Sequence, residues 1–205
     1  MELFFHNQHV FTSSFFISDY TNYRGEEQTP AKGVDIIDNA LPIFEEWPPL
    51  YIFNPHDLPV LTANMEKNPA MCKRANGTKC KQCECLCISK ASDVDDIPWF
   101  ALVELKCCDN NSRDLERNIE SNLQNAIFKL KEHHQLLRDE KGIIEKGKHR
   151  YYWVISIPTV NKPPFSSFLW TQDYLLAISE QYDGARIIAD NEILIVDGSQ
   201  IKGTH

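Results

Sequence analysis

The chain has 205 residues, of which 42% are hydrophobic and 24% charged, so its composition is that of an ordinary globular protein and excludes a largely disordered one. This length suits one domain with a buried core. The formal net charge of −8 excludes a free-standing protein that grips nucleic acid through excess positive charge, so such an activity would need a local basic patch, a metal ion or a basic partner.

The N-terminal residues 1–20 contain several phenylalanines but no basic segment followed by a long apolar run, so they do not form a signal peptide. No stretch approaches the roughly 20 apolar residues of a membrane helix. We therefore expect a cytoplasmic protein with no membrane partner. The cysteine count of 7 is odd, which favours reduced thiols or a metal site over a disulfide framework.

The N-terminal part of the chain contains four short segments that are candidates for strands. They are residues 2–5, 14–18, 50–53 and 58–63. Residues 34–47 look helical, although Pro42 would end that helix or divide it into two pieces. Residues 65–81 contain Pro69, Gly77 and many charges, and we expect them to form a loop.

The most informative stretch is residues 98–108, because a largely apolar run there is interrupted by Glu104 and Lys106. The apolar run predicts a buried strand. Residues two apart point to the same face of a strand, so this strand would carry a carboxylate and an ammonium group on one face near its end. Burying either charge is costly unless it is paired or binds something.

A second strand is expected at residues 83–88, whose side chains divide between two faces. One face would carry Cys83, Cys85 and Cys87, and the other would carry Glu84, Leu86 and Ile88. The polar and acidic segment 89–98 separates this strand from the next one and predicts a long hairpin. The hairpin would place Glu84 and Glu104 on neighbouring strands.

Residues 112–138 form the strongest helix candidate, because their apolar positions recur at spacings of three and four. These positions are Leu115, Ile119, Leu123, Ala126, Ile127 and Leu130. Asn111 or Ser112 would cap the helix. His133 and His134 would lie in its polar C-terminal part, where histidine favours the negative end of a helix.

A buried strand is expected at 151–157, followed by a mixed and mainly helical segment at 166–181 and by two short strands at 187–189 and 192–196. The order strand, strand, long helix, strand implies an α/β or α+β fold in which helices flank a central mixed β-sheet. No linker rich in Pro, Gly or Ser interrupts the chain, so we expect residues 1–205 to form a single domain.

Glu84, Glu104 and Lys106 would then lie close together. Two carboxylates on adjacent strands make a hard oxygen site suited to Mg²⁺ or Mn²⁺, which polarises a phosphate and lowers the pKa of a bound water. A lysine beside the metal orients that water and stabilises the charge that builds up on phosphate oxygens. These groups are the minimum needed to hydrolyse a phosphodiester bond.

This arrangement resembles the PD-(D/E)XK, or restriction-endonuclease-like, nuclease superfamily. The pattern of that superfamily is an acid on one strand, a variable hairpin, Glu-X-Lys on the next strand and then a helix. Here Glu84 would be the first acid and Glu104-Leu105-Lys106 the Glu-X-Lys motif. The resemblance covers residues 80–157, a nuclease-like core on which residues 1–79 and the C-terminal strands within 185–197 would pack.

The resemblance also implies site residues and partners. Such enzymes often carry a glutamine on the following helix, and Gln124 matches it loosely. The implied catalytic set is Glu84, Glu104, Lys106 and Gln124, with Glu84 and Glu104 holding Mg²⁺ or Mn²⁺. The implied substrate is nucleic acid, DNA in preference to RNA, and the acidic chain would work with a protein partner as a subunit of a larger complex.

Two departures from the superfamily pattern leave an alternative open, in which the chain is an inactive nuclease-like scaffold for protein interactions. The first acid, Glu84, stands where Asp is usual. No clear counterpart appears for the acid that many members carry on an N-terminal helix, and Glu45 and Glu46 are candidates only by position. A purely structural interpretation is also open, in which Glu104 and Lys106 form a same-face ion pair on an edge strand and Glu84 is a solvated acid on its strand.

The cysteines support a third hypothesis, a small structural protein stabilised by zinc. Cys80-Lys81-Gln82-Cys83 has the local spacing of a zinc ligand pair, with Cys72 and either Cys107 or Cys108 as further ligands. The sequence has no second Cys-X-X-Cys. Free cysteine is among the most buried residue types, so buried thiols are the alternative to zinc ligands.

Overall fold

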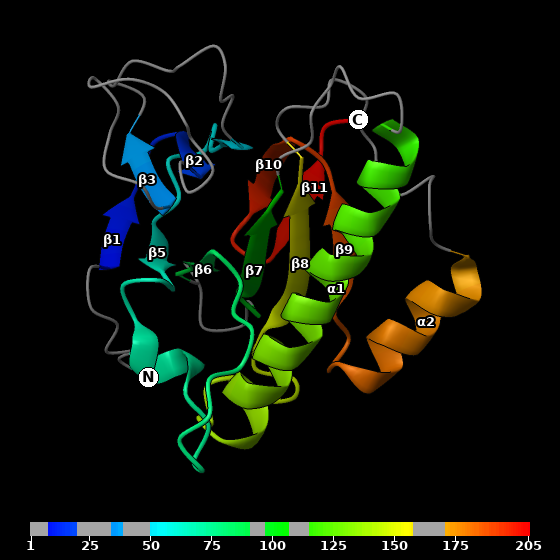
Figure 1. Cartoon of the computed structure of the whole chain (residues 1–205). Coiled ribbons are helices and arrows are strands. Elements are labelled where there is room, and N and C mark those ends of the chain that lie inside the picture. The colour runs from blue at the N-terminus through cyan, green and yellow to red at the C-terminus, as the bar shows by residue number, and fades with distance from the viewer. Residues whose placement is uncertain (1–7, 20–33, 39–49, 91–96, 107–114, 158–170) are drawn as a thin grey trace, which may run out of the picture.

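Two β-sheets and two α-helices make up the part of the chain that the computed structural model describes, which is residues 8–19, 34–38, 50–90, 97–106, 115–157 and 171–205 (Figure 1). The helices pack on one face of the larger sheet, and the smaller sheet packs on its other face. The described residues therefore form three layers, helix, sheet and sheet, in a single α+β domain.

The larger sheet has six strands in the order β1-β5-β6-β7-β8-β9. These strands are β1 (Gln8–Phe11), β5 (Val60–Asn64), β6 (Cys85–Ser89), β7 (Trp99–Leu105), β8 (Arg150–Ser156) and β9 (Arg186–Ala189). β7, β8 and β9 are parallel, whereas the neighbours from β1 to β7 are antiparallel. This sheet is therefore mixed, as the sequence analysis predicted.

The smaller sheet has five strands in the order β11-β10-β4-β2-β3. These strands are β2 (Phe15–Asp19), β3 (Val34–Asp38), β4 (Leu50–Phe53), β10 (Glu192–Asp197) and β11 (Gln200–Gly203). β10 pairs with β4 in parallel and the other neighbours are antiparallel, so this sheet is mixed as well. It joins segments that are far apart in the sequence.

Helix α1 (Leu115–Asp139) connects β7 to its parallel neighbour β8 and packs across both strands (Figure 1). Helix α2 (Gln172–Gln181) packs on β9 and buries Ile178 in the same core. A 3₁₀ helix, η1 (Pro69–Cys72), follows β5 and contacts α1. No helix in the described part of the chain is both long enough and apolar enough to cross a membrane.

Strand β7 is buried on both of its faces. Phe100 and Leu102 belong to the core beneath the helices, whereas Trp99 and Ala101 belong to the core between the two sheets. Successive side chains of a strand alternate between faces, so Glu104 falls on the helix face with Phe100 and Leu102. A carboxylate therefore enters the core that α1 covers.

Most of the predicted elements are confirmed. β6 and β7 form the predicted antiparallel hairpin, and α1 and β8 follow close to the expected boundaries. β2, β4, β5, β9 and β10 match short strands that the sequence indicated, and α2 lies within the segment expected to be mainly helical. The predicted strand at residues 2–5 and the predicted caps Asn111 and Ser112 lie outside the described residues.

The prediction of a helix at residues 34–47 was wrong where the structure describes this segment. Val34–Asp38 form β3, which pairs antiparallel with β2. Valine and isoleucine favour a strand, and the partner strand β2 decides between two structures that so short a segment does not distinguish by itself. The rest of the segment, which includes Glu45 and Glu46, lies outside the described residues.

The sequence analysis did not foresee the second sheet. β1 and β11 were not predicted. The two short strands that were predicted near the C-terminus are β9, which joins the larger sheet, and β10, which joins the smaller sheet. In the described part of the chain, helices cover one face of the larger sheet because the smaller sheet covers the other. A continuous apolar run indicates that a strand has two buried faces, but it does not reveal what covers each face.

Candidate functional site

The candidate site lies where β6 begins and β7 ends. The two strands are antiparallel, so these ends share one edge of the sheet, and the backbone amide of Glu84 donates a hydrogen bond to the carbonyl of Val103 at 3.0 Å. Glu104 follows Val103 on β7. The backbone amide of Lys106 donates to the carbonyl of Ser156 on β8 at 2.8 Å, which fixes the end of β7 between its neighbours.

Lys129, from the middle of α1, reaches both carboxylates. Its Nζ atom lies 3.1 Å from Oε1 of Glu84 and 2.7 Å from Oε1 of Glu104. Nζ of Lys106 lies 2.5 Å from the same oxygen of Glu104. One ammonium group is therefore shared by two carboxylates, and one carboxylate oxygen meets two ammonium groups. We call these four side chains the carboxylate cluster.

Differences in exposure make Glu104 the buried centre of this cluster. Its side chain is 0% exposed, compared with 10% for Glu84, 17% for Lys106 and 27% for Lys129. Glu104 therefore lies beneath the others, and the two lysines extend from it toward the surface. The two acids and two bases balance in formal charge, and such pairing is what allows ionised groups to be buried.

The two lysines pair with only one of the two carboxylate oxygens of Glu104. The closest approach of each lysine is to Oε1, while Oε2 is buried without a hydrogen-bond partner among the described residues. A buried polar atom without such a partner costs about 1–3 kcal/mol, and more when it is charged. A buried polar atom without a partner in a folded protein calls for an explanation, and one explanation is that the atom binds an ion or another ligand.

The surroundings shift the pKa of Glu104 in opposing directions. Burial raises this pKa and the ammonium groups of Lys106 and Lys129 lower it, with burial the stronger effect. For Lys129, burial lowers the pKa, but the carboxylates of Glu104 and Glu84 outweigh burial and raise it. Lys129 is therefore a permanent cation here, whereas the charge on Glu104 depends on cations beside it.

The two carboxylates are ligands of the type that a divalent metal ion such as Mg²⁺ takes. Mg²⁺ in proteins is commonly held by one or two carboxylates, while water and substrate phosphate oxygens complete its octahedral shell. Glu84 and Glu104 already converge on one cation, the ammonium group of Lys129. Among the described residues, no set of three or more His, Cys, Asp or Glu side chains is arranged to hold a metal ion, so water and phosphate would supply the remaining ligands.

No protein-family model matches the chain, and no curated protein or solved structure matches it. The resemblance to PD-(D/E)XK nucleases therefore stands as a proposal, which rests on residues and geometry. Of the residues predicted for the site, the structure brings Glu84, Glu104 and Lys106 together in one cluster.

Gln124 contacts none of the carboxylate cluster in the described structure. It is exposed on α1 and donates a hydrogen bond to Oε1 of Glu120 at 3.4 Å. The residue of α1 that meets the carboxylates is Lys129, which the sequence analysis did not single out. Lys129 lies beside Leu130 and three residues after Ala126, both of which are buried. A charged residue at the margin of the apolar stripe was therefore the feature of the sequence that could have indicated Lys129.

The cysteines of the hairpin lie in two different cores. Cys83 precedes β6 and lies beneath the helices, whereas Cys85 and Cys87 face the smaller sheet. The expectation that these three share one face was wrong, because Cys83 lies outside the regular strand, where strict alternation no longer applies. Cys107 and Cys108 lie outside the described residues.

Two of the buried thiols flank His133. Sγ of Cys83 lies 3.1 Å from Nδ1 of His133, and Sγ of Cys72 lies 4.0 Å from Nε2 of the same ring. The two thiols therefore approach different ring nitrogens and do not meet at one metal position. Burial raises the pKa of Cys72 to about 12 and that of Cys83 well above its usual value, so both stay protonated.

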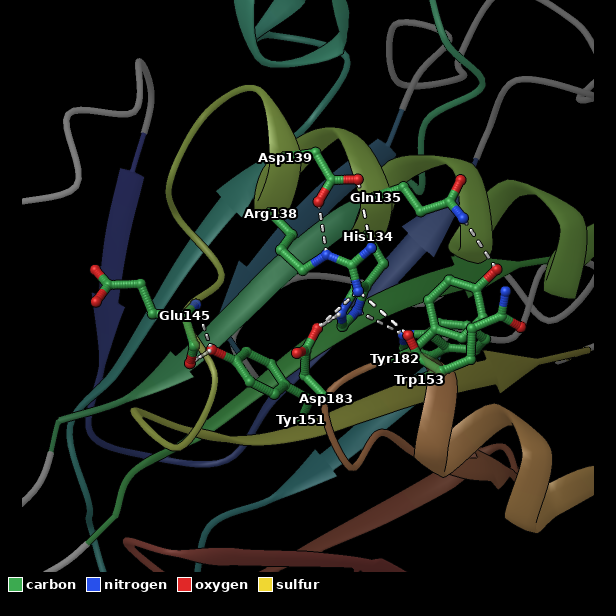
Figure 2. A network of polar contacts seen from close by, with 10 residues as sticks. His134, Gln135, Arg138, Asp139, Glu145, Tyr151, Trp153, Tyr182 and Asp183 are labelled. Carbon is green, nitrogen blue, oxygen red and sulfur yellow. Dashed lines mark hydrogen bonds and ion pairs between the residues drawn. The ribbon is translucent and has the colours of Figure 1, made fainter.

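A second buried polar group, here called the histidine network, surrounds His134 (Figure 2). Nε1 of Trp153 donates to Nδ1 of His134 at 3.2 Å, so Nε2 carries the proton and donates to Oδ2 of Asp183 at 3.1 Å. Arg138 donates to the same oxygen of Asp183 at 3.2 Å. His133 and His134 were expected in a polar part of the helix, but both are fully buried because the last turns of α1 still pack on the core.

Proposed function

We propose that the protein is a nuclease that uses Mg²⁺ or Mn²⁺ to hydrolyse phosphodiester bonds in nucleic acid. The observation that carries this proposal is the convergence of Glu84 and Glu104 on one cation position beside Lys106. Two hard oxygen donors and a lysine are the groups that such hydrolysis needs. Their origin at the ends of two neighbouring strands, with a long helix next, agrees with the pattern of PD-(D/E)XK nucleases.

Each residue of the proposed site has a role that its position supports. A bound divalent ion would neutralise charge on the phosphate and lower the pKa of a water molecule. Glu84 and Glu104 would hold that ion, and the buried position of Glu104 on β7 would fix where it lies. Lys106, which is partly exposed, would donate a hydrogen bond to a phosphate oxygen on which negative charge develops.

The charge of the chain bears on the substrate and on the partner. A net charge of −8 repels a polyanion at long range. We infer that the nuclease works as a subunit of a larger complex, in which a partner supplies the basic surface that holds the nucleic acid. DNA is the preferred substrate class, on the resemblance to the superfamily.

A second candidate function is that of an inactive scaffold for protein interactions. Lys129 pairs with both carboxylates, and this pairing would also stabilise the cluster in a protein that does not cleave nucleic acid. Glu84 in the place of the usual Asp favours the same candidate. The two candidates share the fold and differ in whether the carboxylate cluster binds a metal ion.

Cleavage assays distinguish the two candidates. Wild-type protein, alone and with any copurifying partner, is incubated with plasmid and single-stranded DNA in the presence of Mg²⁺ or Mn²⁺. We expect cleavage by the wild type and by the control Glu180→Gln, which changes an exposed residue of α2, and loss of cleavage in Glu104→Gln and Lys106→Ala. Cleavage that survives both site substitutions would contradict the assignment, and a wild type that never cleaves would favour the scaffold.

A further inference from the structure

The position of Lys129 raises the question of how a metal ion would enter the carboxylate cluster. Nζ of Lys129 lies 2.7 Å from one carboxylate oxygen and 3.1 Å from the other, in the gap between Glu104 and Glu84. Glu84 and Glu104 would hold a divalent ion, and the ammonium group of Lys129 already lies against both of these carboxylates. Two cations so close together repel strongly in a mostly buried site.

We propose that Lys129 and the divalent ion compete for one cation position, so that the ion binds between Glu84 and Glu104 only when the ammonium group of Lys129 leaves. This inference rests on the proposed nuclease function, because it concerns the same metal position. Lys129 thus acts as an internal counter-ion, which balances the charge of the carboxylates until the metal ion and the phosphate bind.

Formal charge supports the exchange. In the described structure, the charges of Glu84 and Glu104 are balanced by Lys106 and Lys129. Adding a divalent ion to this set leaves an excess of positive charge in a buried place, which is unfavourable. Release of Lys129 removes part of this excess, and one phosphodiester group removes the rest. The metal ion and the phosphate are therefore expected to bind cooperatively, with Lys129 displaced by both.

The side chain of Lys129 has a route out of the gap. Its side chain is 27% exposed, whereas that of Glu104 is 0% exposed, so part of the Lys129 side chain meets solvent while Glu104 does not. A lysine stem has four flexible bonds, and a change of rotamer moves its charge without moving the helix. Once displaced, the ammonium group is free to pair with a phosphate of the bound nucleic acid.

Binding of Mn²⁺, measured by isothermal titration calorimetry in the absence of nucleic acid, tests the competition without any assay of activity. The key variant is Lys129→Met, which keeps the approximate length of the side chain and removes its charge, and whose soft thioether sulfur is a poor ligand for Mn²⁺. Lys129→Arg keeps the charge. Lys131→Met changes another lysine of the same helix, whose Nζ lies over the ring of Tyr174 rather than beside the carboxylates. Glu104→Gln removes a proposed ligand.

We expect Lys129→Met to bind Mn²⁺ about tenfold more tightly than the wild type, or more, since close charge pairs commonly couple by at least that factor. Lys129→Arg and Lys131→Met should bind no more tightly than the wild type, and Glu104→Gln should lose binding. Circular dichroism confirms that each variant is folded. If Lys129→Met does not fold, Lys129→Leu replaces it, with the same expected result, because leucine also has no charge and offers no metal ligand.

A second measurement uses the unaltered chain. The affinity of wild-type protein for Mn²⁺ should rise when a phosphorothioate-linked DNA oligonucleotide is present, and the rise should be smaller in the variant that lacks the charge at position 129. Any copurifying partner is included, and fluorescence anisotropy confirms that the oligonucleotide is bound. A bound oligonucleotide that leaves the affinity of the wild type unchanged would contradict the predicted cooperation between metal and phosphate.

The outcomes separate this inference from the proposed function. If the wild type binds Mn²⁺ through Glu104 but Lys129→Met binds no more tightly, the competition is wrong and the nuclease proposal stands. If neither protein binds Mn²⁺ in a manner that depends on Glu104, both the competition and the metal site are wrong, and the scaffold remains.

Discussion

Helix α1 covers two buried polar groups that differ in how completely their atoms are paired. In the histidine network, every buried side-chain nitrogen and oxygen atom has a hydrogen-bond partner. In the carboxylate cluster, Oε2 of Glu104 is buried without a hydrogen-bond partner among the described residues. Fully paired polar networks rigidify a core, and an unpaired buried atom calls for an explanation, so we expect the two groups to have different roles.

The origins of the residues support this distinction. The histidine network joins α1 to β8 and to Asp183, which follows α2, so it links three elements across the core. The carboxylate cluster draws Glu84 and Glu104 from adjacent strand ends at one edge of the sheet. We therefore expect substitutions in the network to change stability, and substitutions in the cluster to change activity and metal binding.

The largest effect is expected from Glu104→Gln. The amide keeps the shape of the side chain but cannot hold a divalent ion as a carboxylate does, so cleavage should fall by about 10³-fold or more. The free energy of unfolding should fall by about 1–3 kcal/mol, which is less than the roughly 3–5 kcal/mol typical of breaking a fully buried ion pair, because Lys106 and Lys129 are partly exposed and Lys129 keeps Glu84 as a partner. Kinetics and urea unfolding measure the two effects. A variant that loses activity only because it unfolds would show that Glu104, like the histidine network, acts on stability.

His134→Ala should have the opposite pattern, with a larger effect on stability than on cleavage. The substitution leaves a cavity and removes the partners of Trp153 and Asp183, so the free energy of unfolding should fall by about 2–4 kcal/mol. The matched control is His56→Ala, which changes an exposed histidine and should be neutral. Urea denaturation at neutral pH measures the change. A loss of stability no larger than that of the control would contradict a structural role for the network.

Acid should destabilise the protein through its buried histidines. Burial lowers the pKa of His133 to about 4 and also lowers that of His134, whereas both are near 6.5 in an unfolded chain. Protonation therefore favours the unfolded chain, and the stability that the neutral rings contribute is complete above about pH 6.5 and is lost as the pH falls toward 4.

For His133, this loss amounts to about 3 kcal/mol by pH 4. The measurement is the free energy of unfolding in urea at a series of pH values between about 7 and 4.5. A His133→Gln variant has no imidazole to protonate at this position, so its stability should fall less steeply over this range. A variant and a wild type with the same slope would show that His133 does not titrate on unfolding.

The smallest effect is expected from Gln124→Ala. This residue is exposed, and its side chain bonds only to Glu120 among the described residues. Exposed substitutions of this kind change stability by less than about 0.5 kcal/mol, and we expect cleavage to be unchanged as well. A loss of cleavage comparable with that of Lys106→Ala would restore Gln124 to the site and would indicate that α1 presents more than one residue to the substrate.

The hairpin and its charges were predictable because they depend on local rules. Alternation along a strand placed Glu104 and Lys106 on one face, and the polar segment between two apolar runs indicated the hairpin that brings Glu84 beside them. Both inferences need only the order of residues along neighbouring strands. The structure agrees with them in the pairing of β6 with β7 and in the ion pair between Glu104 and Lys106.

The contributions of α1 were not predictable in the same way. Which residue of the helix meets the carboxylates depends on how α1 is rotated and shifted against the sheet, and many side-chain contacts decide this together. Lys129, rather than Gln124, faces Glu104 for that reason. The partners of His134 depend equally on the packing of α1, β8 and the turn after α2. No periodicity in the sequence carries this information.

The central position of β7 has a consequence for how the proposed site accommodates a substrate. This strand has β6 and β8 on its two sides and packed layers on both faces, and all of its residues are buried. A strand held in this way cannot follow an incoming molecule. If the proposed site binds a phosphate, any adjustment to different substrate shapes would therefore fall to the lysine side chains, and the reach of Lys106 and Lys129 would set the range of phosphate positions.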